Sequence, residues 1–183
     1  MVINLIILFL SFFQINQEKH LGSIERISSD INKLIDLDSK IEILAEGFDW
    51  SEGPVWSKKL NSILFSDVPN NVIYKWNEKE GLSIFSKSIG YSGKVPNLKK
   101  AGTKGLTIDS EGNLIICMHG DRMIAKMENL NTEKLSSIIR SYNNNILNSP
   151  NDLVYDSYGN LFFTDPPYGL LEGDNDKLKE IPF

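Results

Sequence analysis

A single cysteine, Cys117, leaves the sequence with no intramolecular disulfide and no cysteine-rich zinc site. Cys117 stands within an apolar run, and this setting favours a small buried side chain over a nucleophile. Three catalytic signatures are also missing: the Gly-x-Ser-x-Gly elbow, a glycine-rich phosphate loop with its lysine, and the His-Glu-x-x-His helix. Their absence argues against a serine hydrolase, a phosphate-loop nucleotide site and a zinc protease of that type.

An excess of basic charge is missing as well. The 183 residues include 19 Lys and Arg against 24 Asp and Glu, which gives a net charge of −5. Nucleic-acid binders neutralise phosphates with Lys and Arg, so this balance argues against a nucleic-acid partner. Mild acidity is common in soluble proteins, and it is also compatible with a site for a cation. The composition, 41% hydrophobic and 23% charged, is that of a globular domain rather than a disordered chain.

No apolar run reaches the ~20 residues that a membrane-spanning helix needs. The run over residues 2–13 has the length of the apolar region of a secretory signal. We therefore expect residues 1–20 to be a signal peptide or a short N-terminal anchor. On this interpretation the protein is exported, to the periplasm or outside the cell, and no stable membrane span is expected. Residues 21–40 form a polar lead-in segment, in which Asp30 is expected to cap a short helix.

The rest of the chain repeats itself. The sequence DSEGNL at residues 109–114 recurs as DSYGNL 47 residues later, with five of six positions identical, and a looser copy covers residues 54–67. Each copy combines short apolar strands with Asp, Gly and Asn, which form tight turns. This period predicts an all-β fold, a β-propeller with about four strands per blade. A β-sandwich also has many short strands, but it has no reason to repeat one loop at this spacing.

Propellers gather their functional residues on loops from successive blades, around a central channel. Residues 50–56, 102–106 and 148–153 each stand before the first strand of a repeat unit, and they include Glu52 and Asn151. A carboxylate and an amide oxygen meeting at one axis are ligands that Ca²⁺ prefers. Taken singly, Glu52 is better explained as a solvated acid near a strand start and Asn151 as a turn residue. Their matching positions lead to the hypothesis of a metal site.

Two further polar residues follow predicted strands. His119 comes directly after the strand at residues 114–118, where an imidazole can serve as a base or contact a substrate. Asp165 lies before two prolines that make its turn rigid. It either points at the mouth of the channel or caps the turn.

Six ordered segments together resemble the gluconolactonase family, in the superfamily that also contains regucalcin. They are LGSIER (21–26), AEGF with WSEGPVW (45–56), LFSDVPNN (64–71), CMHGDR (117–122), NSPNDL (148–153) and FTDPPYG (163–169). The resemblance implies a six-bladed propeller with one divalent cation, usually calcium, in its channel. Glu52 matches the family's metal-binding glutamate, and Asn151 matches a channel asparagine beside metal and substrate. His119 is expected to line the pocket.

The same resemblance indicates what lies outside this sequence. The family's other metal ligands, an asparagine and an aspartate, belong to later blades, and the aspartate is thought to be the general base. We expect these residues beyond Phe183, so the catalytic residue is not assigned within the chain. Residues 41–183 are expected to form an incomplete propeller of about three blades, from a truncated gene or a partial reading frame. Little or no turnover is expected from such a fragment.

The resemblance favours a metal-dependent lactonase that opens a sugar lactone to its aldonic acid. The cation would polarise the lactone carbonyl while water attacks. Relatives often carry an arginine shortly before the channel asparagine, and residues 144–147 contain none, so the sugar-acid specificity stays open. The alternative is a non-catalytic propeller fragment that binds calcium or a partner, and hydrolysis of another lactone or ester is a third hypothesis. Open blade edges are also expected to favour self-association.

Overall fold

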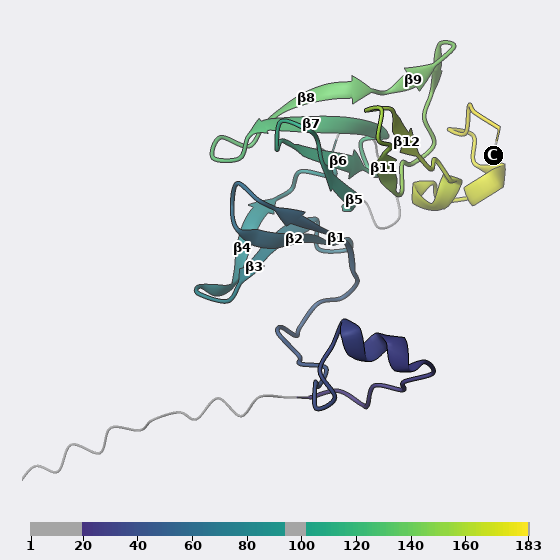
Figure 1. Ribbon diagram of the computed structural model, residues 1–183. Coiled ribbons are helices and arrows are strands. Elements are labelled where there is room, and N and C mark those ends of the chain that lie inside the picture. Colours follow the sequence, from purple (N-terminus) through teal and green to yellow (C-terminus); the bar gives the residue numbers. More distant parts are fainter. Residues whose placement is uncertain (1–19, 94–101, 183) are drawn as a thin grey trace, which may run out of the picture. The chain divides into compact units, whose positions relative to one another are not determined.

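Short antiparallel strands joined by tight turns make up most of the chain in the computed structural model, which describes residues 20–93 and 102–182 (Figure 1). The chain divides into two units, with the boundary between Glu46 and Gly47. The apolar residues 2–13, on which the signal or anchor prediction rests, lie outside the described residues. Within the described ranges, no helix is long and apolar enough to cross a membrane.

The N-terminal unit contains one short helix, the 3₁₀ helix η1 (Ser29–Lys33). The prediction that Asp30 caps it is wrong, because the N-cap is Ser28, whose hydroxyl accepts a hydrogen bond from the backbone N–H of Asp30. Ser28 has the extended backbone that places an N-cap side chain over the first turn. Asp30 lies inside the helix instead and pairs with Lys33, with 2.7 Å between Oδ1 and Nζ.

The second unit consists of successive antiparallel sheets, each folded as a meander. The first sheet contains β1 (Ser51–Ser57), β2 (Ser62–Asp67), β3 (Val72–Asn77) and β4 (Gly81–Lys87) in that order. The second contains β5 (Thr103–Ile108), β6 (Leu114–Met118), β7 (Met123–Asn129) and β8 (Lys134–Ile139). A hairpin of β11 (Leu153–Tyr155) and β12 (Leu161–Phe163) follows. The remaining short elements are β9 (Ser141–Tyr142), β10 (Asn145–Ile146), η2 (Pro167–Gly169) and η3 (Gly173–Asn175).

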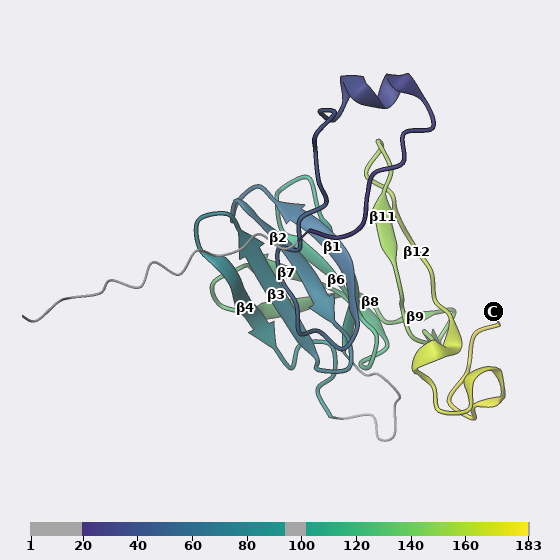
Figure 2. The same ribbon diagram turned by 90° about the horizontal axis from the view of Figure 1, so that it is seen from below.

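This arrangement confirms the predicted partial β-propeller. Two four-stranded sheets have the form of complete blades, and the β11–β12 hairpin supplies the first two strands of a third. In the view of Figure 2, turned by 90°, the two blades lie face to face, as their shared core requires.

The repeated sequence folds into a repeated turn. Between β5 and β6, the carboxylate of Asp109 accepts hydrogen bonds from the backbone N–H groups of Glu111 and Asn113, at 3.0 and 2.8 Å. It also accepts one from the side-chain amide of Asn113, at 2.9 Å. Gly112 takes the left-handed conformation (φ 79°) that closes the turn. The Asp, Gly and Asn of the motif therefore each have a defined part in the turn.

The second copy of the motif makes the same contacts between β11 and β12. The carboxylate of Asp156 accepts from the backbone N–H groups of Tyr158 and Asn160, at 2.9 and 2.8 Å, and from the Asn160 amide at 2.8 Å. Gly159 has a φ of 85°. The sequence repeat is thus a repeat of turn geometry, which joins the first two strands of the second blade and of the third.

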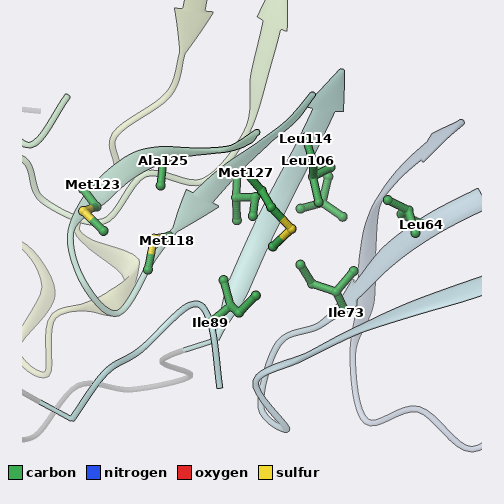
Figure 3. Packing of buried hydrophobic residues seen from close by; sticks show 10 residues of the cluster. Leu64, Ile73, Ile89, Leu106, Leu114, Met118, Met123, Ala125 and Met127 are labelled. Carbon is green, nitrogen blue, oxygen red and sulfur yellow. The ribbon is translucent and has the colours of Figure 1, made fainter. Parts of the chain in front are cut away.

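The core lies between neighbouring blades rather than inside one of them. Figure 3 shows Leu64 and Ile73 of the first sheet facing Leu106, Leu114 and Met127 of the second. A second cluster joins the second sheet to the hairpin; its buried members are Ile115, Cys117, Ile124 and Leu153. Because alternate residues of a strand face opposite sides of the sheet, the two clusters together bury the whole of β6.

Cys117 illustrates this burial. Its side chain is fully buried, as the sequence predicts, and burial raises the pKa of the thiol well above its ordinary value. A thiol in this state is a small apolar side chain rather than a nucleophile.

The outer face of the β11–β12 hairpin leads to a prediction about assembly. Val154 and Phe162 are cross-strand partners and are 60% and 58% exposed. Within the described residues, β12 pairs only with β11. We propose that a second copy of the chain covers this apolar face, because removing exposed apolar side chains from water favours association. The average mass in sedimentation experiments is therefore expected to rise with protein concentration.

Charging the face tests this proposal. The double substitution Val154→Lys and Phe162→Lys is expected to suppress association, because two ammonium groups cannot be buried against a second copy. Tyr158→Lys is the matched control, since Tyr158 is 90% exposed at the turn of the same hairpin. A wild-type chain that stays monomeric at all concentrations would contradict the proposal.

Candidate functional site

The strands β1, β5 and β11 are the first strands of the three blades. Their N-terminal ends lie against one another, because Gly53 and Gly105 have no side chain to keep the backbones apart. A Cβ on Gly53 would stand 2.6 Å from the carbonyl oxygen of Lys104, and one on Gly105 would stand 2.7 Å from Oδ1 of Asp152. The backbone N–H of Gly105 donates to the carbonyl of Asn151 at 2.8 Å. Residues from three successive blades therefore meet at one place.

β-Bulges beside Glu52 and Lys104 direct side chains toward the point where the three blades meet. The register of β1 against β2 shifts between Glu52 and Val55, and that of β5 against β6 shifts between Thr103 and Leu106. The two irregularities occupy equivalent positions in successive blades. A bulge twists its strand locally and changes the direction of a side chain, and bulges are frequent next to functional sites.

The side chain of Lys104 lies at the centre of the site. Its Nζ is 2.9 Å from Oδ1 of Asn151 and 3.4 Å from Oε2 of Glu52, and it stands 4.6 Å from the centre of the Trp50 ring. The Lys104 side chain is only 4% exposed, whereas that of Glu52 is 24% exposed. The structure thus brings Glu52 and Asn151 together, with an ammonium between their oxygens.

Sequence reasoning did not assign a role to Lys104. The signal that could have found it is its position. Residues 102–106 lie at the start of β5, as residues 50–56 lie at the start of β1 and residues 148–153 at the start of β11. A lysine does not belong to an oxygen-ligand pattern, however. Its contacts depend on the bulge, which the sequence does not reveal.

The backbone around Lys104 is held on both sides. The Ser66 hydroxyl donates to the Lys104 carbonyl at 2.7 Å, and the Thr103 hydroxyl donates to Ser66 Oγ at 2.9 Å. Both bonds are buried. Since an unpaired buried ammonium is unfavourable, the contacts with Glu52, Asn151 and Trp50 are what make this position tenable.

His119 lies behind the loop that carries Asn151. It is 1% exposed, with Nδ1 3.2 Å from the carbonyl of Pro150, to which it donates. Its Nε2 has no hydrogen-bond partner in the described residues and lies against Gly169, where a Cβ would come within 2.7 Å. Burial first, and the charge of Lys104 second, lower the His119 pKa to about 4. The imidazole is therefore neutral, and its predicted role as a substrate contact stays a prediction.

Asp165 does not cap its own proline turn but holds a neighbouring loop, at residues 148–149. Its carboxylate accepts hydrogen bonds from the backbone N–H groups of Asn148 and Ser149, at 2.7 and 2.9 Å. Burial raises the pKa of Asp165. These bonds fix the loop at residues 148–151 and so position Asn151.

Arg122 supports the same loop from the other side. Its Nε donates to the carbonyls of Leu147 and Asn148, at 2.6 and 3.0 Å, and the residue is 4% exposed. The CMHGDR segment carries no sign of this role, because the contact spans about 25 residues of sequence.

A divalent cation can be tested against these residues. The oxygens of Glu52 and Asn151 are hard donors of the kind that Ca²⁺ takes. The Lys104 ammonium, however, is within bonding distance of both. In residues 20–93 and 102–182, no group of three or more His, Cys, Asp and Glu side chains could hold a metal ion. With Lys104 in this position, the residues present do not fit a divalent cation, because two positive groups would share the same oxygens.

Comparison with known proteins gives the family. Residues 50–179 match the SMP-30/Gluconolactonase/LRE-like region. A gluconolactonase from Zymomonas mobilis subsp. mobilis is 36% identical over 165 residues, which cover 89% of this chain and 46% of the relative. The chain therefore belongs to the SMP-30/gluconolactonase/LRE-like family, and it spans about half the length of this curated relative.

Solved structures agree with this assignment. A gluconolactonase from Xanthomonas campestris superposes with a TM-score of 0.63 at 28% identity, over 73% of this chain and 41% of the other. The structure of a putative gluconolactonase gives a TM-score of 0.62 at 30% identity, over 76% of this chain and 44% of the other. The resemblance expected from the six segments is thereby confirmed.

Acid is expected to destabilise the protein through His119. The unfolded side chain takes up a proton near pH 6.5, and the folded one only at a pH of about 4. The unfolded state thus binds more protons between these values. The stability from this group is complete above pH 6.5 and falls as the pH drops toward 4, by roughly 2–4 kcal/mol. Urea unfolding at a series of pH values measures this.

His119→Gln should flatten the pH dependence in that window, whereas Asn131→Gln, an exposed change that removes and adds no titratable group, should leave it unchanged. The raised pKa of Asp165 acts in the opposite sense and is present in all three proteins. An identical slope in wild type and His119→Gln would show that His119 is not the responsible group.

The close approach of the first strands predicts a steric effect at Gly105. Gly105→Ala is expected to lower the free energy of unfolding by about 1–3 kcal/mol, because the new methyl group must displace the backbone at Asp152. Gly159→Asn serves as control, since a Cβ there meets nothing within 4 Å and Asn tolerates the left-handed backbone. Equal losses in both variants, measured by urea unfolding, would refute the steric explanation.

Proposed function

We propose that this protein acts on a small sugar lactone and hydrolyses its ester bond. The observation that carries the proposal is the cluster of Glu52, Lys104 and Asn151, contributed by three successive blades in a chain of this family. The relatives named gluconolactonases, at 36% and 28% identity, support the same class of substrate.

The cluster has the groups that such a substrate needs. A sugar lactone presents several hydroxyls, which donate hydrogen bonds, and a carbonyl oxygen, which accepts them. The Glu52 carboxylate and the Asn151 amide oxygen are acceptors, and the Lys104 ammonium is a donor. As water adds to the carbonyl carbon, negative charge grows on its oxygen, and a fixed positive group nearby stabilises that charge. The assigned roles are thus binding, orientation and charge stabilisation.

Export also belongs to this proposal. The apolar residues 2–13 support a protein that works in the periplasm or outside the cell. Fractionation of cells that express the chain with a C-terminal tag measures its location directly. Recovery of the protein in the cytoplasmic fraction alone would contradict this part of the proposal.

Lactone recognition can be measured with a stable analogue. The lactam corresponding to gluconolactone does not hydrolyse, so its affinity is obtained by calorimetry while hydrolysis of gluconolactone is followed by acid release. Glu52→Gln is expected to weaken lactam binding about tenfold or more, because a charged hydrogen-bond acceptor is lost. Glu128→Gln, on the exposed end of β7, is the matched control and should bind as the wild type does.

The outcomes separate the hypotheses. Lactam binding with lactone hydrolysis above the spontaneous rate supports the enzyme. Lactam binding without hydrolysis agrees with the low turnover expected from the sequence, and it supports lactone recognition with the binding propeller as the function of this chain. Neither binding nor hydrolysis contradicts the proposed substrate class, and equal affinities of wild type and Glu52→Gln contradict the proposed site.

A further inference from the structure

The ammonium of Lys104 has the surroundings of a bound cation. Its Nζ contacts one carboxylate oxygen and one amide oxygen, from residues that enter or precede β1 and β11, while it is itself carried by β5. The ring of Trp50 covers it at 4.6 Å, a distance typical of a cation–π contact. Three blades thus converge on a positive charge that the chain itself provides.

Lys104 is a fixed part of the site and not a surface side chain that can swing away. It is 3% exposed, and its backbone lies inside the bulge between Thr103 and Leu106. The Ser66 hydroxyl holds its carbonyl, and Gly53 packs against the same oxygen. Moving the ammonium out would leave Glu52 with an unpaired charge in a partly buried place.

The neighbouring titratable groups have other partners. Asp152 accepts from the backbone N–H of Leu153 at 2.9 Å, and Asp165 is held by two backbone N–H groups. His119 is neutral and donates to Pro150. Glu52 is therefore the carboxylate that pairs with Lys104, so the pair has no net charge with which to attract a further cation.

We propose that the Lys104 ammonium takes the place of a divalent cation in this chain. The Glu52 and Asn151 oxygens, which the family resemblance assigns to metal binding, here hold an internal cation instead. If the proposed function is right, on which this second step rests, Lys104 is also the positive group that faces the lactone carbonyl oxygen. The site then presents one fixed charge that chelators cannot remove.

Terbium luminescence tests the replacement directly. Tb³⁺ prefers the same oxygen donors as Ca²⁺, and a Tb³⁺ ion in the position of Nζ would lie close enough to Trp50 to be sensitised by it. The wild-type chain is expected to give no saturable signal. Lys104→Gln, which removes the charge and adds an amide oxygen, is expected to bind Tb³⁺ at least about tenfold more tightly, and Ca²⁺ should raise its melting temperature.

Two controls define the site. Adding Glu52→Gln to Lys104→Gln should abolish the new binding, because the carboxylate ligand is then gone. Lys134→Met, which removes an exposed lysine at the start of β8, should behave like the wild type.

The proposal is overturned if the wild-type chain shows saturable, Trp-sensitised Tb³⁺ binding that Glu52→Gln removes. It is also overturned if Lys104→Gln binds the ion no better than the wild type does. The wild-type and Glu52→Gln measurements do not need Lys104→Gln, so saturable binding at Glu52 in the wild-type chain overturns the proposal even if Lys104→Gln fails to fold. Because ion binding does not depend on lactone, a wild-type chain that binds neither Tb³⁺ nor the lactam would contradict the proposed substrate and support the replacement.

Discussion

Each blade of this protein has an apolar face that it cannot bury alone, and this constraint governs the rest of the structure. The second blade has neighbours on both sides, so every residue of β6, from Leu114 to Met118, is buried. Stacking the blades brings the starts of their first strands together, which is tenable only because Gly53 and Gly105 carry no side chain. Packing far from the site therefore decides which polar groups meet at it.

Those polar groups form one electrostatic unit. A buried ammonium needs compensation, and Lys104 obtains it from Glu52 of one blade, Asn151 of another and the ring of Trp50. Asn151 is in turn held by a loop that Asp165 and Arg122 fix. The chain belongs to a family whose named relatives include gluconolactonases. The family resemblance leads one to expect a divalent cation at this site, and the Lys104 ammonium lies there instead.

The repeated features of the sequence were sufficient to predict the corresponding turns and blades of the structure. The matching Asp109 and Asp156 motifs predicted hairpin turns and hence a propeller, and both make the same hydrogen bonds. Matching positions also placed Glu52 and Asn151 at one axis, where the structure brings them together. Lys104 was missed because its direction depends on a β-bulge, which leaves no mark in a strand's apolar pattern. The loop-fixing contact of Arg122 joins residues far apart in sequence, and no local pattern encodes it.

The central claim is that a lysine, and not a divalent cation, lies between Glu52 and Asn151. Anomalous diffraction from crystals of the wild-type chain grown with terbium measures this most directly, because a bound ion gives a strong peak at a defined position. We predict no peak between the two oxygens, with Nζ of Lys104 within hydrogen-bond distance of Asn151 Oδ1. A peak coordinated by Glu52 and Asn151, with the Lys104 side chain turned away, would contradict the account.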